Sequence, residues 1–391
     1  MIKKIYVKQT SDAVDFKQAL QEVFTLLKPY KGKGFKLSAF VDAKDTSDYI
    51  EKRNQLSEAI KSCFENECPT WSILSEAPRN ATLCVVLQCS EADKTYLDFC
   101  GLTSLKATPL PIVILEQNSE KELWVSGLSS LDEDMHTSAN AVFEMLSAVL
   151  KEFGFEYDDI VRQWNYIGKI LKTETKNDLY TQNYQMFNDI RNDYYLRNKK
   201  MSNFPAATGI GMKIQGLVVD VFARKNGTDV DVRAGEEIVQ SLPLRSKVQK
   251  NPFAYSEAVL VGDKTNKKPP LFERARMLYS KNQAQIFVSG TASIKNQETV
   301  AIDDVSAQTT NTIRYIEELV SPENIQDNYP HITLNYQTYQ RVRVYVKHRN
   351  DIETVFKICT AHFPEHVINV VEADICRDNL LVEIEADLYM S

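Results

Sequence analysis

The sequence lacks the patterns that mark metal centres and disulfide scaffolds. Its seven cysteines and five histidines include no CxxC pair and no HExxH motif, the spacings that typically hold zinc. The number of cysteines is odd, and the opening residues alternate like a strand rather than forming an export signal. Reduced thiols are therefore expected. We predict a cytoplasmic protein without a metal site.

Two further absences concern its partners. No stretch approaches the roughly 18 continuous apolar residues that a membrane-spanning helix needs. Lysine and arginine number 46 against 53 aspartates and glutamates, a net charge of −7, whereas a nucleic-acid surface usually shows a basic excess. The sequence therefore predicts neither a nucleic-acid partner nor a membrane partner.

What the 391 residues do contain is a repeated pattern. Residues 123–130 and 286–293 are each an apolar strand that runs into Ser-Gly, followed by an acidic stretch. Apolar residues then recur at helical spacing over 142–153 and again over 305–320, as on one face of a helix. The length also exceeds the roughly 250–300 residues that one core usually supports. A duplication is the simplest explanation.

The parallel continues along both halves. Residues 161–167, 184–195 and 217–223 are consistent with a strand, a helix and a strand, and the second half repeats this order after residue 342 with one additional strand. Helices that return to one face of a mixed sheet suit this order. We predict an α+β fold of two related modules in tandem. The polar turn at residues 224–227 divides it into an N-terminal domain, 1–224, and a C-terminal domain, 225–391.

The Ser-Gly segments have two interpretations. Gly127 and Gly290 can simply allow a turn where a Cβ would clash. Alternatively, the backbone amides after Gly290, together with Thr291 and Ser293, can cradle an anionic group of a ligand. The second copy is richer in hydroxyl groups, so it is the favoured site.

The last strand carries two carboxylates. In a strand that starts at Leu380, Glu383 and Glu385 point to the same face. A carboxylate that faces inward is costly unless it is paired or used, and burial raises its pKa so that it can act as a general acid. Solvent exposure is the alternative for Glu383. Arg274 and Arg343 lie on or beside strands, where they could bind a carboxylate with two hydrogen bonds or be ordinary surface residues.

The Ser-Gly segment, the acidic stretch, the helix and the closing strand at 382–386 resemble the RidA/YjgF superfamily, whose modules have a chorismate-mutase-like fold. Typical members are imine deaminases that hold a substrate carboxylate with the arginine of a Pro-Ala-Arg motif. Ala207 stands at that position in the first copy and Ile368 in the second. Both copies therefore lack the deaminase signature.

A narrower resemblance, to the chorismatases, covers the chain from Val161 to its end, while residues 1–120 match only in outline. It is carried by segments 164–166, 187–195, 204–211, 287–294 and 373–385. Chorismatases remove the enolpyruvyl side chain of chorismate as pyruvate and leave a hydroxybenzoate or a dihydroxycyclohexadiene acid. They need no metal or redox cofactor. The resemblance implies the same for this chain, with chorismate as its small-molecule substrate.

The resemblance also implies roles for individual residues. Glu383 is the acid that protonates the enol ether, and Cys376 beside it marks the branch that makes 3-hydroxybenzoate, because the hydrolysing branch has alanine there. Arg274 and Arg343 would clamp the two carboxylates of chorismate. The remaining residues implied in substrate binding are Gly290, Thr291, Ser293, Arg191 and Tyr195.

Two alternatives stay open, a RidA-like imine deaminase and a non-catalytic small-molecule binding protein of the YjgF superfamily. The joint presence of Cys376, Arg377 and Glu383 favours an enzyme over a binder. One departure leaves the product isomer open, because the family's histidines are missing near Gln297 and Ala301. A tandem chain can supply internally an interface that single RidA modules form between subunits, so a monomer or a small homo-oligomer is expected.

Overall fold

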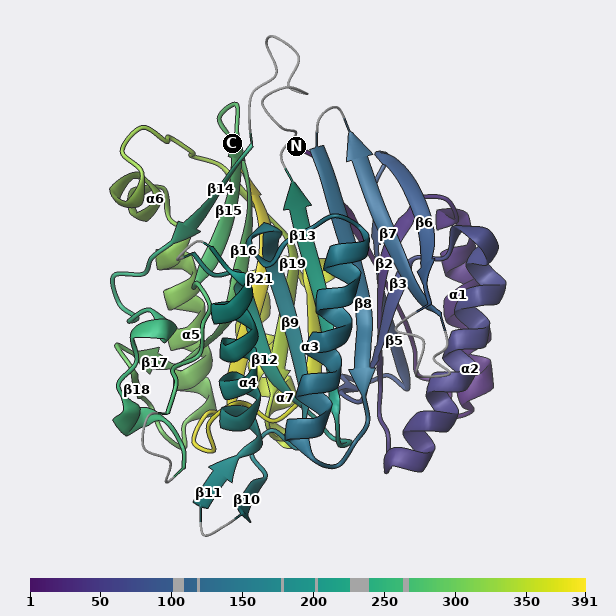
Figure 1. Ribbon diagram of the computed structural model, residues 1–391, viewed down its shortest axis with the longest axis horizontal. Helices are drawn as coiled ribbons and strands as arrows, with labels where there is room; N and C mark the ends of the chain where they lie inside the picture. Colours follow the sequence, from purple (N-terminus) through teal and green to yellow (C-terminus); the bar gives the residue numbers. More distant parts are fainter. Residues whose placement is uncertain (101–108, 118–119, 177–178, 201–202, 226–238, 263–266) are drawn as a thin grey trace.

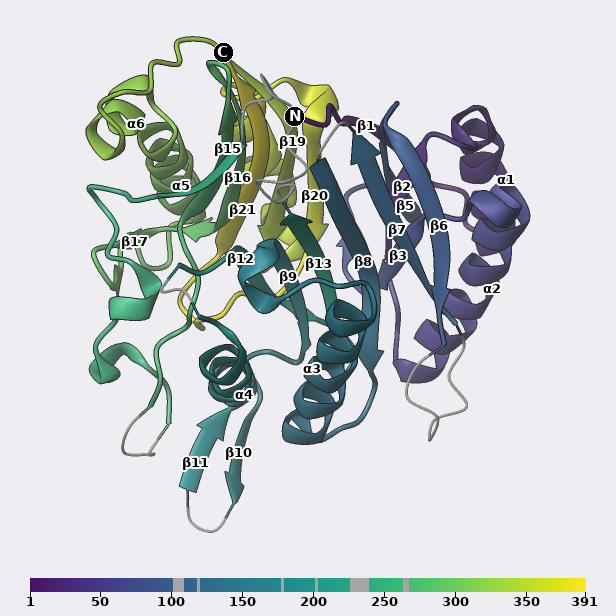
Figure 2. The same cartoon turned by 45° about the horizontal axis from the view of Figure 1, so that its top comes forward.

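The computed structural model describes the chain except for residues 101–108, 118–119, 177–178, 201–202, 226–238 and 263–266. Its strands form three main sheets. The helices lie around the outside, so that the sheets face one another across the interior (Figures 1 and 2). None of the described helices is long and apolar enough to cross a membrane. The predicted fold class, α+β with mixed sheets and helices on one face, is confirmed.

The sheet of the C-terminal part of the chain, called here the third sheet, contains the second Ser-Gly segment and the strand of Glu383 and Glu385. Its strand order is β14-β15-β16-β21-β19-β20-β4. The strands are β14 (Gln240–Leu244), β15 (Ala275–Ser280), β16 (Gln283–Ala292), β19 (Gln337–Val346), β20 (Ile368–Glu372), β21 (Val382–Met390) and β4 (Ala77–Pro78). Its helices are α5 (Val305–Leu319), α6 (Pro322–Asn328) and α7 (Ile352–Thr360). A short hairpin joins β17 (Ile294–Lys295) to β18 (Glu298–Thr299).

The second sheet repeats this topology in the order β12-β9-β13-β8-β7-β6. Its strands are β6 (Asp93–Phe99), β7 (Leu110–Gln117), β8 (Glu120–Ser130), β9 (Ile160–Gly168), β12 (Ala206–Met212) and β13 (Leu217–Lys225). Its helices are α3 (Met135–Glu152) and α4 (Asn183–Asn198), and β10 (Thr173–Lys176) pairs with β11 (Leu179–Gln182). The pair β12–β9 is parallel, as is β20–β19. The duplication predicted from the Ser-Gly segments is confirmed.

The structure adds a third module that the sequence did not predict. Its sheet has the order β1-β5-β2-β3, again with one parallel pair, β2–β3. Its elements are β1 (Ile5–Ser11), α1 (Phe16–Leu27), β2 (Gly34–Val41), α2 (Thr46–Phe64), β3 (Thr70–Leu74) and β5 (Leu83–Cys89). The predicted N-terminal domain, 1–224, therefore holds two modules. Its boundary after residue 224 falls one residue before the end of β13 and stays a prediction.

The first helix of each module begins at an aspartate. The side chains of Asp15, Asp134 and Asp304 each accept a hydrogen bond from a backbone N–H in the first turn of α1, α3 and α5. Such N-caps satisfy donors that have no partner within the helix. The acidic stretch after each Ser-Gly segment is thus the start of the helix that follows β8 in the second module and β16 in the third.

Buried ion pairs join the modules where the three sheets meet. Glu385 on β21 accepts hydrogen bonds from Arg162 on β9 (2.7 Å) and from Arg341 on the neighbouring strand β19 (2.6 Å). Between the first and second modules, Lys36 on β2 pairs with Asp220 on β13. All five side chains are at most 3% exposed. Because a buried charge without its partner is strongly destabilising, these pairs specify how the modules assemble.

We expect Arg162→Met to lower the free energy of unfolding by about 3 kcal/mol, because it leaves the Glu385 carboxylate short of a counter-charge in the interior. The matched control is Lys200→Met, which removes the exposed ion pair of Lys200 with Glu156 and should cost less than about 1 kcal/mol. Urea unfolding of both variants measures the difference. Equal losses would contradict a structural role for the buried pair.

Candidate active site

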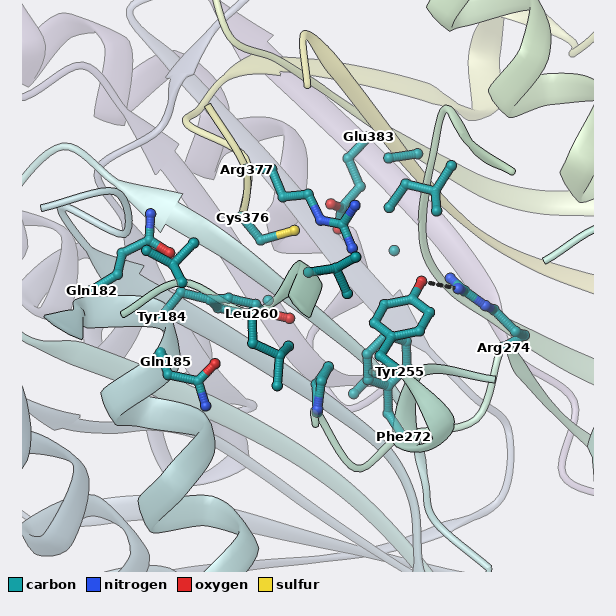
Figure 3. A pocket seen from close by; sticks show the side chains of 18 residues that line it. Gln182, Tyr184, Gln185, Tyr255, Leu260, Phe272, Arg274, Cys376, Arg377 and Glu383 are labelled. Carbon is teal, nitrogen blue, oxygen red and sulfur yellow. Dashed lines mark hydrogen bonds between the residues drawn. The ribbon is translucent and has the colours of Figure 1, made fainter. Parts of the chain in front are cut away.

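A narrow cavity of about 60 Å³ lies between the second and third modules. The second module contributes α4, β12 and the residue before α4. The third contributes β16, β21 and the loop that precedes β21 (Figure 3). Residues that line it include Gln182, Tyr184, Ala207, Gly209, Tyr255, Arg274, Gly290, Cys376, Arg377 and Glu383. The site therefore depends on contacts between modules, and neither module forms it alone.

Glu383 is the acidic residue of the cavity. It lies on β21, opposite Ala292 of β16, and is 4% exposed. Burial raises the pKa of its carboxyl to about 8, repulsion from Glu385 adds to this, and Arg274 and Arg162 offset it only in part. At neutral pH the carboxyl therefore holds its proton, as a general acid must.

Gly290 makes room for that carboxyl. A Cβ at Gly290 would lie 1.9 Å from Oε1 of Glu383, far inside the contact distance of two heavy atoms. The Gly290 N–H donates to Oγ1 of Thr208 on β12 (3.0 Å), which ties β16 to the second module. Of the two interpretations of this glycine, the need for space is the one that the geometry supports.

Glu385, two residues further along the same strand, is in the opposite protonation state. Burial by itself would raise the pKa of its carboxyl, but Arg341, Arg162 and Arg343 outweigh it and lower the pKa to about 2. Thr208 also donates to it at 2.5 Å. Two carboxyl groups whose environments push their pKa values apart can serve as one acid and one fixed anion.

Cys376 lies in the loop between β20 and β21, and its sulfur faces the cavity (Figure 3). The loop is held to β12 because the Gly211 N–H donates to the Asp374 carbonyl (2.8 Å). Burial, with Glu383 nearby, raises the pKa of the thiol to about 12. The group is therefore a neutral thiol at physiological pH and not a thiolate nucleophile.

Two arginines reach the cavity. Arg274, just before β15, donates through Nη2 to Oη of Tyr255 (2.5 Å) and to the Lys250 carbonyl (3.0 Å). Its Nε has no hydrogen-bond partner among the described residues. Arg377 donates to the Gln297 carbonyl (2.8 Å), and its guanidinium carbon lies 5.6 Å from the centre of the Tyr255 ring. The described residues contain no cluster of three or more side chains placed to hold a metal ion.

Thr291 and Ser293, which the sequence placed in the ligand site, face away from it. Gly290, Ala292 and Ile294 line the cavity, and side chains alternate along a strand. Thr291 donates to the Ser289 carbonyl and Ser293 to the Val300 carbonyl. The expected hydroxyl cradle is wrong, because the alternation that brings Gly290 to the cavity turns both hydroxyl groups away.

Three other predicted binding residues also lie elsewhere. Arg343 donates to the Tyr166 hydroxyl (2.7 Å) and pairs with Glu385, so it belongs to the buried ion network. Arg191 donates to Asn188 of its own helix, and the Tyr195 hydroxyl donates to Gln163. None of the three is among the residues that line the cavity. Their geometry is that of structural residues in the interior.

The sequence did not single out the cavity residues from the second module, chiefly Tyr184 on α4 and Gly209 on β12, nor Tyr255 from the third. Arg377 was noted beside Cys376 and Glu383 but not as a residue that binds the substrate. Within the second module only Ala207 was noted, as the position of the deaminase arginine, and it does line the cavity. A search for strand residues adjacent to Ala207 would have found Gly209. Tyr255 lies in a segment without regular periodicity and gave no signal.

With this geometry in view, three comparisons with known proteins agree. Residues 114–223 match the family described as chorismatase FkbO/Hyg5-like, N-terminal. A 3-hydroxybenzoate synthase from Streptomyces hygroscopicus is 28% identical over 258 residues, which cover 63% of this chain and 68% of that protein. A chorismatase from Streptomyces rapamycinicus is 30% identical over 233 residues, covering 59% of this chain and 64% of that protein.

The comparison of folds also finds a chorismatase, and it covers more of the chain than the sequence matches do. A crystal structure of a chorismatase matches 100% of this chain and 99% of its own, with a TM-score of 0.69 and 16% identity. The fold is therefore that of this chorismatase. The sequence matches and the fold thus agree that this chain is similar to chorismatases.

The raised pKa of Glu383 predicts a pH-dependent stability. The folded state keeps the proton up to about pH 8, while the ordinary value is 4.5. The free energy of unfolding should therefore fall, relative to Glu383→Gln, by up to about 1.4 kcal/mol per pH unit between these values. Urea unfolding at pH 5, 6, 7 and 8 tests this, with the exposed Glu298→Gln as control. A constant difference between Glu383→Gln and the parent protein would refute the assignment.

Proposed function

We propose that this chain is a chorismatase that releases pyruvate from chorismate and leaves 3-hydroxybenzoate as the ring product. The observation that carries the proposal is a protonated carboxyl, Glu383, in a cavity that it shares with Arg274, Arg377 and Cys376. An enol ether is cleaved by protonating its terminal methylene carbon, and an acid that holds its proton at neutral pH is suited to that step.

The proposed reaction starts with proton transfer from Glu383 to the methylene carbon of the enolpyruvyl group. The positive charge that develops at the ether-bearing carbon is then next to the carboxylate just formed. Breaking the bond between the ether oxygen and the ring leaves that oxygen as the keto oxygen of pyruvate. The ring hydroxyl oxygen then attacks the carbon that the ether oxygen leaves and loses its proton, which forms an epoxide. Opening of the bond to the original hydroxyl carbon, with protonation of the oxygen, leaves the hydroxyl group at the 3-position. Loss of the ring proton from that carbon gives 3-hydroxybenzoate. Chorismate has the composition of pyruvate plus 3-hydroxybenzoate, so this outcome consumes no water.

Arg274 and Arg377 are the proposed clamps for the two carboxylates of chorismate. Arg274 has a donor, Nε, without a partner among the described residues, and a carboxylate can accept from a guanidinium at two points. The guanidinium carbons of Arg274 and Arg377 lie 5.8 and 5.6 Å from the centre of the Tyr255 ring, so both arginines border the same side chain. This pair replaces the pair Arg274 and Arg343 expected from the sequence, because Arg343 is already bound to Tyr166 and Glu385.

Gln297 lies in the segment where the family's histidines are missing. Gln297 accepts from the Ser256 N–H (3.1 Å) and donates to the Ser256 hydroxyl (3.0 Å), while its carbonyl accepts from Arg377. It thereby connects one cavity arginine to the segment that carries Tyr255. A volume of about 60 Å³ is small for chorismate, so binding requires this segment or its side chains to move outward.

Two observations bear on the alternatives. Ala207 lines the cavity without offering a cation, which argues against an imine deaminase that holds its substrate with an arginine there. A binding protein without catalysis would not need an acid kept protonated by burial, which costs stability. The modules meet at interfaces within one chain, which supports a monomer, and the proposed location is the cytoplasm.

The first test is incubation with chorismate, with pyruvate measured by a coupled assay. Pyruvate should form, and Glu383→Gln should lower kcat by at least about 100-fold, because general acid catalysis typically contributes that much. The protonated form is the active one, so kcat/KM of the parent protein should fall above about pH 8. Glu298→Gln is the control and should keep full activity. No pyruvate from the parent protein at any pH, or turnover retained in Glu383→Gln, would overturn the proposal.

The identity of the ring product depends on Cys376. A neutral thiol beside Glu383 occupies space that a smaller side chain would leave open to water, so Cys376→Ala should shift the product toward the dihydroxycyclohexadiene acid. Chromatography distinguishes the two outcomes, because the aromatic 3-hydroxybenzoate and the dihydroxycyclohexadiene acid are different ring products. An unchanged product in Cys376→Ala would remove the thiol from the choice of product.

A further inference from the structure

The three modules create three equivalent interfaces, and a cavity lies at each of them. We propose that the interface between the first and second modules is a second binding site, for a small carboxylate with a ring or another apolar body. This site is separate from the cavity around Glu383 and does not depend on the proposed reaction.

The equivalence of the two interfaces follows from strand register. Leu128 pairs with Val219, and Thr291 pairs with Ile384, each next to a register shift. Gly127 therefore corresponds to Gly290. On the partner strands, Asp220 corresponds to Glu385, and each accepts a hydroxyl hydrogen bond from the preceding module, from Ser72 and Thr208 respectively. Both cavities thus have the same supporting frame.

The register also shows what the second cavity lacks. The residue that corresponds to Glu383 is Val218, which precedes Val219 on β13 as Glu383 precedes Ile384 on β21. Val218 is a buried apolar residue. Because this position holds no acid, the cavity between the first and second modules can bind a molecule but cannot protonate it in the way proposed for Glu383.

The walls of the second cavity are suited to an apolar anion. Its volume is about 300 Å³, and the described residues that line it include one cation, Arg53, and no aspartate or glutamate. Phe99 and Met145 provide apolar surface. Trp71 is 8% exposed, and its indole N–H has no partner in the described part of the chain. A buried donor without a partner is costly, and an acceptor on a ligand would satisfy it.

Arg53 is placed across the interface. It lies on α2 of the first module, and its Nη2 donates to Oγ of Ser129 on β8 at 3.3 Å, a long and weak hydrogen bond. Gly127 brings the two walls together: its φ is +77°, and a Cβ there would lie 2.5 Å from the Trp71 carbonyl oxygen. The close approach puts the cation of one module beside the hydroxyl of the next.

The third interface, between the third and first modules, differs in that its cations are already paired. Arg79 donates to both oxygens of Glu353, at 2.8 and 2.9 Å. Lys8 donates to the Ile368 carbonyl at 2.6 Å. Its cavity is also smaller, about 210 Å³. Among the interfaces other than that of Glu383, the one at Arg53 is therefore the better anion site.

Benzoate is the probe, because it carries the expected carboxylate and ring and cannot undergo enol-ether cleavage. Titration calorimetry of the full chain should show a benzoate site that Arg53→Gln weakens at least about tenfold, the loss expected when a charge-assisted hydrogen bond is removed. Arg314→Gln is the matched control, since Arg314 is an exposed helical arginine bonded to a residue of its own helix. It should leave binding unchanged.

A second variant guards against misfolding. Asn54 lines the cavity from the exposed face of α2, so Asn54→Trp should fill its mouth without disturbing the core and should also abolish this benzoate site. Turnover of chorismate should be unaffected in both variants. The proposal is overturned if no benzoate site responds to either change, or if the responding site is lost equally in Arg377→Gln, whose side chain lies in the other cavity.

Discussion

The rest of the structure depends on one buried carboxylate, Glu385, held between arginines of two modules. Arg162 from the second module and Arg341 from the third both donate to it, and these contacts keep it ionised although it is fully buried. Two residues earlier, the same strand carries Glu383, and the fixed negative charge of Glu385 is one reason that Glu383 keeps its proton. The contact that assembles two modules therefore also prepares the acid between them.

Such an arrangement is stable only when it is complete. A buried ion pair gains little over apolar packing, but removing one partner leaves a charge that the interior cannot solvate. Each of two equivalent interfaces has a complete ion pair. Lys36 pairs with Asp220 between the first and second modules, and Arg162 pairs with Glu385 between the second and third. Incorrect pairing of modules would leave these charges unmatched, so the network selects one assembly from the several that similar sheets could form.

The features that follow from local periodicity could be predicted from the sequence. The features that depend on contacts between distant residues could not. Strand alternation correctly placed Glu383 and Glu385 on one face, and helical spacing located α3 and α5. The same alternation, applied to β16, would have shown that Thr291 and Ser293 point away from Gly290. The first module was missed because its strand β1 ends in Thr10 and Ser11 without the Ser-Gly pair. Arg343 and Arg377 could not be told apart by sequence, because only the packing of three sheets decides which one meets the ion network and which one meets the cavity.

Duplication also explains why one interface carries the acid and its equivalent does not. Gly127 and Gly290 are both required by close approach, the first to the Trp71 backbone and the second to the Glu383 carboxyl. Where Gly290 leaves room for a carboxyl, the neighbouring strand supplies Glu383. At the equivalent place the strand supplies Val218, and Trp71 occupies the β3 position that corresponds to Ala207 on β12, as the matching contacts of Ser72 and Thr208 show. The frame is common to both, so the difference between an acid site and a binding cavity comes from a few side chains on that frame. A change at one interface need not disturb the other, because each has its own ion pair to keep its modules together.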